Sequence, residues 1–193
     1  MLRRFIGWTL RLAGHRHALA WLAVISFIES SILPVSPDLL IIPMAYAQPR
    51  KAWAIAAVAT LGSLAGGLVG YAIGHFLFQA VGEPLIHFYG AEASYERFRA
   101  LYHEWGIWIV ALGGFTPMLY KVVTIASGAV GLNVAAFAVT LALSRALHFG
   151  LVAGLVAYFG APAKRFLEQN LMLVTMILLA LLLGGLLAFR YVS

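Results

Sequence analysis

Apolar residues fill long stretches of the chain, and the first two stretches are too short to cross a membrane. Residues 18–28 and 39–49 each hold 11 uncharged residues. A hydrocarbon core about 30 Å thick needs roughly 20 helical residues. The polar segment between them, residues 29–38, contains Pro34 and Pro37, which interrupt a helix. The pattern predicts a broken helix or a re-entrant hairpin, because irregular backbone survives at membrane depth only where protein or water covers it.

A long uncharged stretch follows, residues 52–82, and predicts a spanning helix that ends near Gly82 and Pro84. Within it, glycines recur at every fourth position and share one face, which lets another helix backbone approach closely: Gly62, Gly66, Gly70 and Gly74. We expect this face to be a packing surface.

The second half of the chain repeats this pattern after a polar interlude. Residues 83–104 carry charges and apolar side chains at helical spacing, which predicts an amphipathic helix on the membrane surface. Residues 105–132 are apolar but are interrupted at Gly114 and Pro117, so they predict a second broken hairpin. Residues 133–160 predict a second long helix.

The expected fold is an all-α polytopic membrane protein with two inverted repeats. Each repeat is a broken re-entrant hairpin followed by a long transmembrane helix. The expected units are a basic amphipathic interfacial helix over 1–17, a membrane domain over 18–160 (first repeat about 18–80, surface helix about 83–104, second repeat about 105–160) and a C-terminal transmembrane helix over 171–190.

Lysine and arginine placement predicts a cytoplasmic N-terminus but leaves the hairpin topology open. With re-entrant hairpins, eight Lys and Arg residues lie on the cytoplasmic side against three on the far side. The count is the same if each broken pair crosses the membrane once. The shortness of the broken segments favours re-entrance. We therefore expect a multi-pass protein of the inner, cytoplasmic membrane.

The composition excludes several classes of protein. Hydrophobic residues make up 63% and charged residues 10% of the chain, too few charges to cover a soluble domain of this size. The net charge of +6 fits anionic lipid surfaces and is no argument for nucleic acid as a partner. The absence of cysteine excludes disulfides and thiolate chemistry.

Four charged side chains interrupt the apolar stretches and are the candidate functional residues. Glu29 and Asp38 lie in the first repeat, Lys121 and Arg145 in the second. Each is costly at membrane depth unless it is paired or hydrated. Two interpretations stay open: ion pairs that only hold the halves together, or a polar site in which Lys121 and Arg145 bind an anionic substrate and Glu29 and Asp38 couple to protons.

Other chemistry has less support in the sequence. His75 and His148 lie in long helices, either as buried hydrogen-bonded histidines or as parts of a proton relay. Residues at metal-ligand spacing are missing from the membrane segments, so we expect no metal and no cofactor. The serines lack a Gly-x-Ser-x-Gly element, and we do not expect an enzyme.

The polar positions together resemble those of a known family. Glu29, Pro34, Pro37-Asp38, then Gly114-Phe115-Thr116-Pro117-x-x-x-Lys121 and Ser144-Arg145 are similar to the DedA, or SNARE-associated (VTT-domain), membrane family, in particular its YqaA-like branch. The resemblance covers roughly residues 18–160. It implies opposed re-entrant hairpins and lipid movement across the bilayer: recycling of undecaprenyl phosphate in bacteria and scrambling of phospholipids in eukaryotic relatives, with a link to the proton motive force.

One motif departs from the better-known members, which carry Gly-Arg-Phe-x-Pro-x-x-Arg. Here Gly114 stands at the first Arg position, and Lys121 follows the proline one residue later than the second Arg. A lysine binds phosphate as a point charge, without the two-pronged geometry of arginine. Arg145 is the candidate for the second cation.

The sequence therefore predicts a flippase- or scramblase-like transporter that moves an anionic lipid, such as a phospholipid or polyprenyl phosphate, between leaflets. Its partners are membrane lipids, with protons as a candidate coupling ion and a homo-oligomer as an open alternative. A proton- or ion-coupled transporter of a small solute, and a membrane enzyme acting on lipid phosphate, are the other classes left open.

Overall fold

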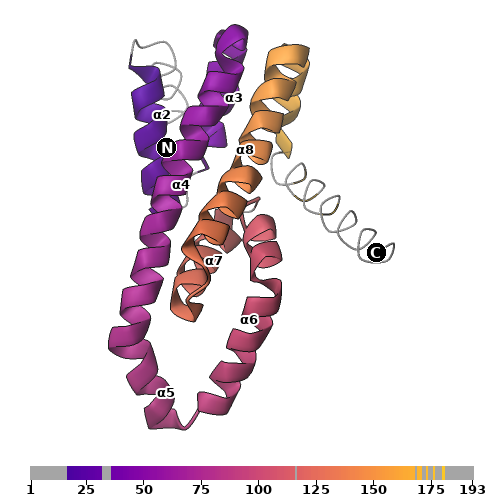
Figure 1. Ribbon diagram of the computed structural model, residues 1–193. Helices are drawn as coiled ribbons and strands as arrows, with labels where there is room; N and C mark the ends of the chain where they lie inside the picture. Colours follow the sequence, from indigo (N-terminus) through magenta and orange to yellow (C-terminus); the bar gives the residue numbers. More distant parts are fainter. Residues whose placement is uncertain are drawn as a thin grey trace.

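The structure, a computed structural model, describes residues 17–31, 36–115 and 117–167, with residues 169, 170, 173, 176 and 180 besides. The predicted helices over 1–17 and 171–190 lie outside the described residues apart from single positions, and so does Pro34. Seven α-helices make up most of the described chain (Figure 1): α2 (Ala18–Ser31), α3 (Asp38–Ala47), α4 (Ala52–Leu77), α5 (Glu83–Tyr89), α6 (Glu92–Gly113), α7 (Pro117–Val130) and α8 (Val134–Phe159). Short helical turns precede and follow α4, η1 (Pro49–Lys51) and the π-helix η2 (Phe78–Gly82).

Two helical segments are long and apolar enough to cross a membrane. One runs without a break over Pro49–Tyr89, through α4, η2 and α5, and the other is α8. Helices α2 and α3 have 14 and 10 residues. At about 1.5 Å of rise per residue, neither reaches across a hydrocarbon core of about 30 Å.

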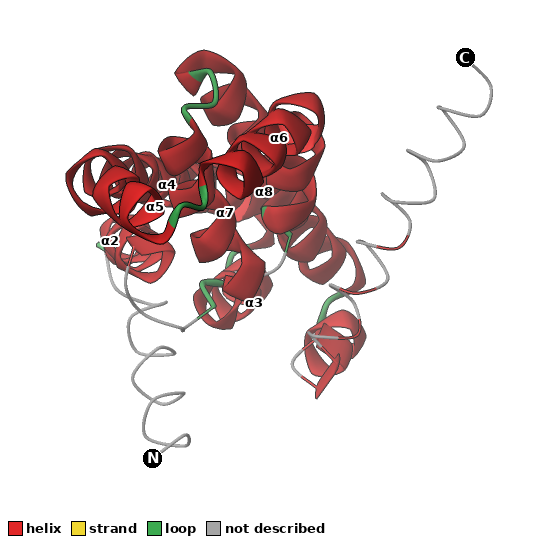
Figure 2. Ribbon diagram, turned by 90° about the horizontal axis from the view of Figure 1, so that it is seen from below, coloured by secondary structure: helices red, strands yellow, loops and turns green. Residues whose placement is uncertain are grey.

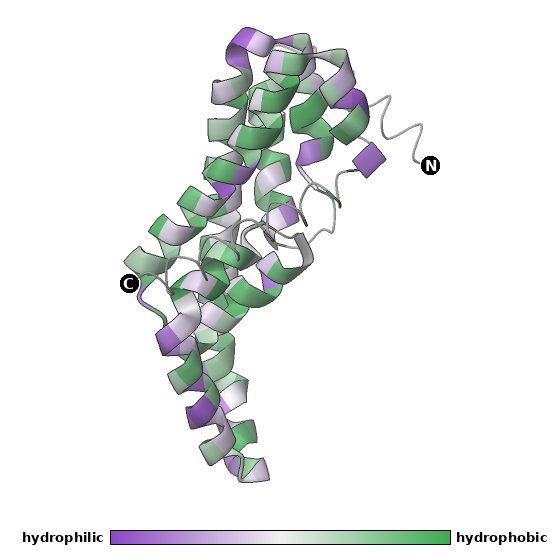
Figure 3. Ribbon diagram, turned by 90° about the vertical axis from the view of Figure 1, so that its right-hand side faces the viewer, coloured by the Kyte–Doolittle hydropathy of each residue, from purple (hydrophilic) through white to green (hydrophobic). Residues whose placement is uncertain are grey.

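The outer surface of the bundle is apolar, as a lipid environment requires. Trp53 and Leu61 on α4, Val122 on α7 and Leu143 on α8 are each at least 65% exposed. Figure 3 shows hydrophobic residues along most of the helical shafts, and Figure 2 shows only helices and loops in the described part. A soluble domain would not leave so much apolar surface in water. The exposed apolar surface and the two long apolar helices are those expected of a helical membrane protein.

The buried apolar residues form two clusters, with polar residues between them. The first cluster joins α2 and α3 to the first half of α4 and the last half of α8, and includes Leu22, Ile41 and Phe149. The second joins α6 and α7 to the first half of α8, and includes Tyr120 and Phe137. Along both long helices, the buried polar side chains stand between these clusters: Thr60 and Ser63 on α4, and Ser144, Arg145 and His148 on α8.

Helix α4 packs against α2, α7 and α8, and glycines set its closest approaches. A Cβ at Gly62 would lie 2.6 Å from the backbone oxygen of Ala23 in α2, and a Cβ at Gly74 would run into the Ile125 carbonyl of α7. Gly128 of α7 faces the Tyr71 carbonyl of α4 in the same way. Glycine on both helices thus allows the two backbones to touch.

One helix boundary differs from the sequence prediction near Pro84. The helix predicted to stop at Gly82–Pro84 does not stop there. It widens into the π-turn η2 and continues as α5. A proline lacks an N–H group and its ring collides with a preceding carbonyl in an α-helix. A π-turn holds one more residue within its hydrogen-bonded turn than an α-turn, which lets the helix accommodate the proline and continue.

A second boundary differs between the polar interlude and the second hairpin. The predicted surface helix 83–104 and the hairpin arm that follows it are not separate, since α6 runs continuously from Glu92 to Gly113. The chain turns instead at Gly90, which has a positive φ of 61°. No proline lies between residues 92 and 113, so nothing in the backbone stops the helix at residue 105.

The α4–α7 contact gives the first prediction. Gly74→Ala should lower the free energy of unfolding by about 1–3 kcal/mol, because the added methyl group must push the α7 backbone away. Gly154→Ala on α8 is the matched control, since its Cβ would meet only the Trp53 ring at 3.9 Å. The measurement is thermal unfolding in detergent. Equal midpoints for the two variants would contradict the close approach.

Candidate functional site

The four charged residues singled out in the sequence lie on four different helices. Glu29 is near the end of α2, Asp38 begins α3, Lys121 is in the first half of α7 and Arg145 is near the middle of α8. Glu29, Asp38 and Arg145 are buried, with exposures of 2%, 2% and 1%, and Lys121 is half-buried. Arg145, Asp38 and Lys121 all lie within electrostatic range of the Glu29 carboxylate. The fold thus brings the acids of one half to the bases of the other.

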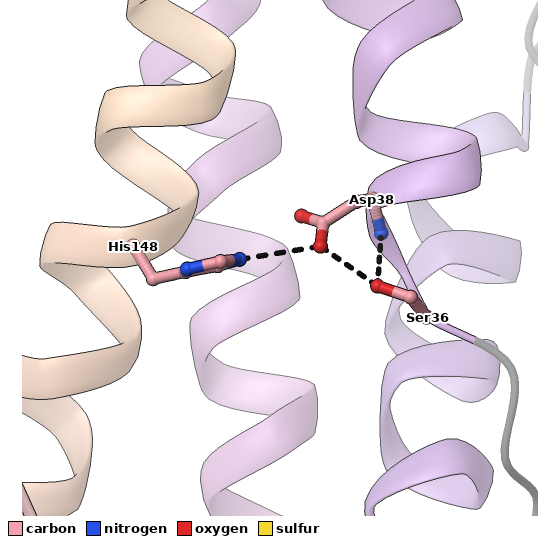
Figure 4. A network of polar contacts seen from close by, with 3 residues as sticks. All are labelled: Ser36, Asp38 and His148. Carbon is pink, nitrogen blue, oxygen red and sulfur yellow. Dashed lines mark hydrogen bonds and ion pairs between the residues drawn. The ribbon is translucent and has the colours of Figure 1, made fainter. Parts of the chain in front are cut away.

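Asp38 has a hydrogen-bond partner that the sequence did not predict for it. His148 Nε2 lies 3.2 Å from Asp38 Oδ2, and the Ser36 hydroxyl donates to the same oxygen at 2.7 Å (Figure 4). Asp38 also stands in the first turn of α3, which begins after Pro37. A carboxylate is favoured there by the positive end of the helix dipole. His148 is therefore buried and hydrogen-bonded, and this contact fits both interpretations given for it from the sequence.

Arg145 is held by aromatic faces. Its guanidinium carbon lies 3.9 Å from the centre of the Tyr120 ring and 5.3 Å from that of Phe149. Such cation–π contacts stabilise a cation out of water. Nε and Nη2 of the guanidinium group have no hydrogen-bond partner among the described residues. The ring contacts thus fix the position of Arg145 while these two nitrogens stay available for hydrogen bonding.

A chain of hydrogen bonds fixes Tyr120 in turn. Its hydroxyl donates to the Ser63 carbonyl of α4 at 2.6 Å, and the Ser63 and Ser30 hydroxyls lie 2.8 Å apart. These contacts connect α2, α4 and α7 at the level of Arg145. Sequence reasoning missed Tyr120 as a site residue, because an aromatic next to Lys121 carries no signal of its own.

Several buried polar atoms in this region have no hydrogen-bond partner among the described residues. They belong to side chains on three helices: Ser26 Oγ, Glu29 Oε2, Asp38 Oδ1, His148 Nδ1, and Nε and Nη2 of Arg145. A buried polar group without a partner costs about 1–3 kcal/mol, and more when it is charged. The site therefore has an unused capacity to bind a polar group, with N–H donors on the Arg145 side.

The break between α6 and α7 lies beside this site. Helix α6 ends at Gly113 and α7 begins at Pro117, as the predicted interruption requires. The Ser144 hydroxyl of α8 donates to the Ala111 carbonyl at 2.6 Å, which satisfies one of the last carbonyls of α6. Any Cβ at Gly114 would run into that hydroxyl. The glycine at this position of the motif thus lets the α6–α7 turn approach α8 one residue from Arg145.

His75 does not join this site. It lies in a pocket of about 290 Å³ at the far end of α4, which Glu96 and Arg99 also line. Four of the ionisable groups there are paired: Arg99 with Glu96 at 3.6 Å, and His87 with Glu92 at 2.9 Å. Hydrogen bonds to its own backbone and to His87 lower the pKa of Glu92. No three His, Asp or Glu side chains in the described part of the chain are placed to hold a metal ion.

Comparisons with known proteins agree with this architecture. Residues 35–158 match the VTT domain. A protein of Haemophilus influenzae, described as uncharacterized, is 32% identical over 166 residues, which is 86% of either chain. A Histophilus somni protein, described as an uncharacterized homolog, is 33% identical over 163 residues, 84% of this chain and 85% of its own. No solved structure gives a significant match. The resemblance found in the sequence is confirmed: the chain belongs to the VTT-domain, or DedA, family of membrane proteins.

Proposed function

We propose that the protein moves an anionic lipid, a phospholipid or polyprenyl phosphate, between the leaflets of the cytoplasmic membrane. The observation that carries this proposal is the buried Arg145, held by aromatic faces, with two nitrogens that have no partner among the described residues. A phosphate group offers the acceptor oxygens that such an arginine binds in pairs. The half-buried Lys121, on the neighbouring helix α7, supplies the second positive charge.

The acids have a complementary role in this proposal. In the absence of lipid, Glu29 and Asp38 balance the charges of Lys121 and Arg145, within electrostatic range of one another. When a headgroup enters, its phosphate replaces the carboxylates as the partner of the cations. Competition between the carboxylates and the phosphate keeps the affinity of the site for the headgroup moderate, so that the lipid can also dissociate.

The proposed topology has both helix breaks at mid-membrane. For the first break, Ser30, near the end of α2, reaches Ser63 near the middle of α4, and the start of α3 reaches His148 near the middle of α8. For the second break, the end of α6 reaches Ser144 near the middle of α8. Ala18 and Ala45 also share one apolar cluster, so α2 and α3 run into and out of the same half of the bundle. We therefore propose re-entrant hairpins and a cytoplasmic N-terminus. The inverted relation between the repeats and the YqaA-like branch stay predictions.

The decisive experiment for this function is leaflet exchange of labelled lipids in proteoliposomes. Fluorescent phosphatidylglycerol and a short polyprenyl phosphate should move between leaflets faster with the protein than without it. Transport of a small solute without lipid movement would favour the transporter alternative. Release of phosphate from a labelled lipid would favour the membrane enzyme.

The topology can be tested with single cysteines, because the chain has none of its own. Ala93→Cys should react with a membrane-impermeant thiol reagent only from the non-cytoplasmic side, and Lys51→Cys and Ala161→Cys only from the cytoplasm. All three positions are exposed. Labelling of Lys51→Cys from the non-cytoplasmic side would mean that the first broken segment crosses the membrane, and the re-entrant topology would be wrong.

A double substitution separates lipid binding from structural charge pairing. Lys121→Met alone should destabilise the protein, because it removes a cation that balances the buried Glu29. Adding Glu29→Gln should bring the unfolding midpoint in detergent back towards wild type. Lipid exchange should stay near background in the double variant, because the headgroup still lacks its cation. Lys121→Arg should keep partial exchange, since the charge remains and its geometry changes.

The matched control for Lys121 is Lys51→Met, which removes an exposed lysine at the end of η1. It should leave both stability and lipid exchange unchanged. If the double variant of Lys121 and Glu29 regains exchange together with stability, Lys121 is only a structural counter-ion and its phosphate role is wrong.

Substitutions at Tyr120 test how Arg145 is held. Tyr120→Phe keeps the ring beneath the guanidinium group and loses only the hydrogen bond to Ser63. Tyr120→Leu loses both the ring and the hydrogen bond. Its lipid exchange rate should be at least about fivefold lower than that of Tyr120→Phe, as expected for a desolvated cation–π contact of about 1–2 kcal/mol. Equal exchange rates in the two variants, measured in the same proteoliposomes, would show that the ring face does not position Arg145.

A further inference from the structure

His148 is the buried titratable group that the proposed lipid site does not yet use. Its ring is hydrogen-bonded to Asp38, and both side chains are 3% exposed (Figure 4). Asp38 Oδ2 already accepts from Ser36, and an ionised carboxylate can only accept. His148 Nε2 therefore carries the proton of this contact. His148 Nδ1 is buried without a hydrogen-bond partner among the described residues, so it is the atom that can still take up a proton.

The formal charges around the hydrogen-bonded pair of Asp38 and His148 come from four helices and sum to zero when the His148 ring is neutral. Helix α3 contributes Asp38 and α2 contributes Glu29, two carboxylates. Helix α7 contributes Lys121 and α8 contributes Arg145, two cations. The rings in contact with His148, Phe115 and Phe149, carry no charge. A proton on His148 would leave this buried group of side chains with an excess of one positive charge.

An anionic headgroup supplies the missing negative charge. A phosphodiester that binds at Lys121 and Arg145 without a proton would leave one unbalanced negative charge in a desolvated site, which is strongly unfavourable. A proton on His148 restores neutrality, and Asp38 is already in place to hold the imidazolium that forms. The same proton turns Nδ1 into a donor.

We infer that His148 takes up one proton for each anionic headgroup that enters the site, so that lipid and proton bind together. This inference rests on the proposed function and names its coupling group. The proton comes from water and is bound at Nδ1 while the phosphate occupies the site. It returns to water when the lipid leaves, and no other bond is made or broken. His148 thus takes the role that the sequence analysis gave to Glu29 and Asp38.

The test is the proton stoichiometry of lipid binding by the full-length chain. The purified protein in detergent and weak buffer, with a pH indicator, is titrated with short-chain phosphatidylglycerol, and with phosphatidylcholine as the lipid of zero net charge. Wild-type protein should take up about one proton per bound phosphatidylglycerol and none for phosphatidylcholine. Because protons are taken up on binding, affinity for phosphatidylglycerol should fall as the pH rises from 5.5 to 8.5.

The informative variant is His148→Gln, which keeps a donor near Asp38 and cannot be protonated. It should bind phosphatidylglycerol at least tenfold more weakly than wild type at pH 5.5, without proton uptake and with an affinity independent of pH. His103→Gln, on the exposed face of α6, is the matched control and should behave as wild type. If His148→Gln does not fold, wild-type protein labelled with ¹⁵N-histidine gives the same answer, since one imidazole must become protonated on binding.

The outcomes are distinguishable. Binding of phosphatidylglycerol to wild type without proton uptake, or without a change at any imidazole, overturns the inference and leaves the lipid site intact. Uptake that persists in His148→Gln but is lost in Glu29→Gln or Asp38→Asn also overturns it and assigns the proton to an acid. No binding of phosphatidylglycerol by wild-type protein overturns the proposed function itself.

Discussion

Charge balance inside an apolar bundle is the constraint on which this structure depends. Glu29 and Asp38 belong to the first half of the chain, and Lys121 and Arg145 to the second. None of them can be left alone at membrane depth without a cost of about 2.5–3.5 kcal/mol or more. The two halves must therefore meet where these side chains stand. The glycines of α4 make that meeting close, because they let α2 and α7 approach its backbone on two sides.

The helix breaks and the charged residues lie together for one physical reason, which is that both need polar neighbours inside an apolar bundle. A helix that ends inside a membrane exposes backbone N–H or C=O groups that need partners. Ser144 supplies one for α6, and Ser36 and Asp38 supply polar groups at the start of α3. The polar side chains needed at the helix ends are thus the neighbours of the charged ones. Breaks and charges gather in the same layer, between two apolar clusters that hold the ends of the long helices together.

The sequence was sufficient for features that depend on single residues or short spacings. Charges within apolar stretches, prolines within them and a glycine every fourth residue each have one main physical cause, so Glu29, Asp38, Lys121 and Arg145 could be singled out directly. The partner of Asp38 could not be, because His148 is 110 residues away and only the packing of α3 on α8 brings them together. The end of the helix that includes α4 was misplaced for a different reason: a proline stops an α-helix but a π-turn can absorb it, and the position of a proline in the sequence does not distinguish the two.

The way Arg145 is held is our reason for proposing a binding site in place of a structural ion pair. A cation that serves only to neutralise a carboxylate would be most stable with its N–H groups directed at that carboxylate. Here the guanidinium carbon lies over the Tyr120 and Phe149 rings, and Nε and Nη2 have no hydrogen-bond partner among the described residues. The aromatic contacts stabilise the charge without using its hydrogen bonds. Glu29 and Asp38 likewise each keep one oxygen without a partner there. A structural ion pair would be more stable if the free Arg145 nitrogens bonded to the free carboxylate oxygens of Glu29 and Asp38. A phosphate-binding site would then bind phosphate more weakly, because the same nitrogens would already be occupied.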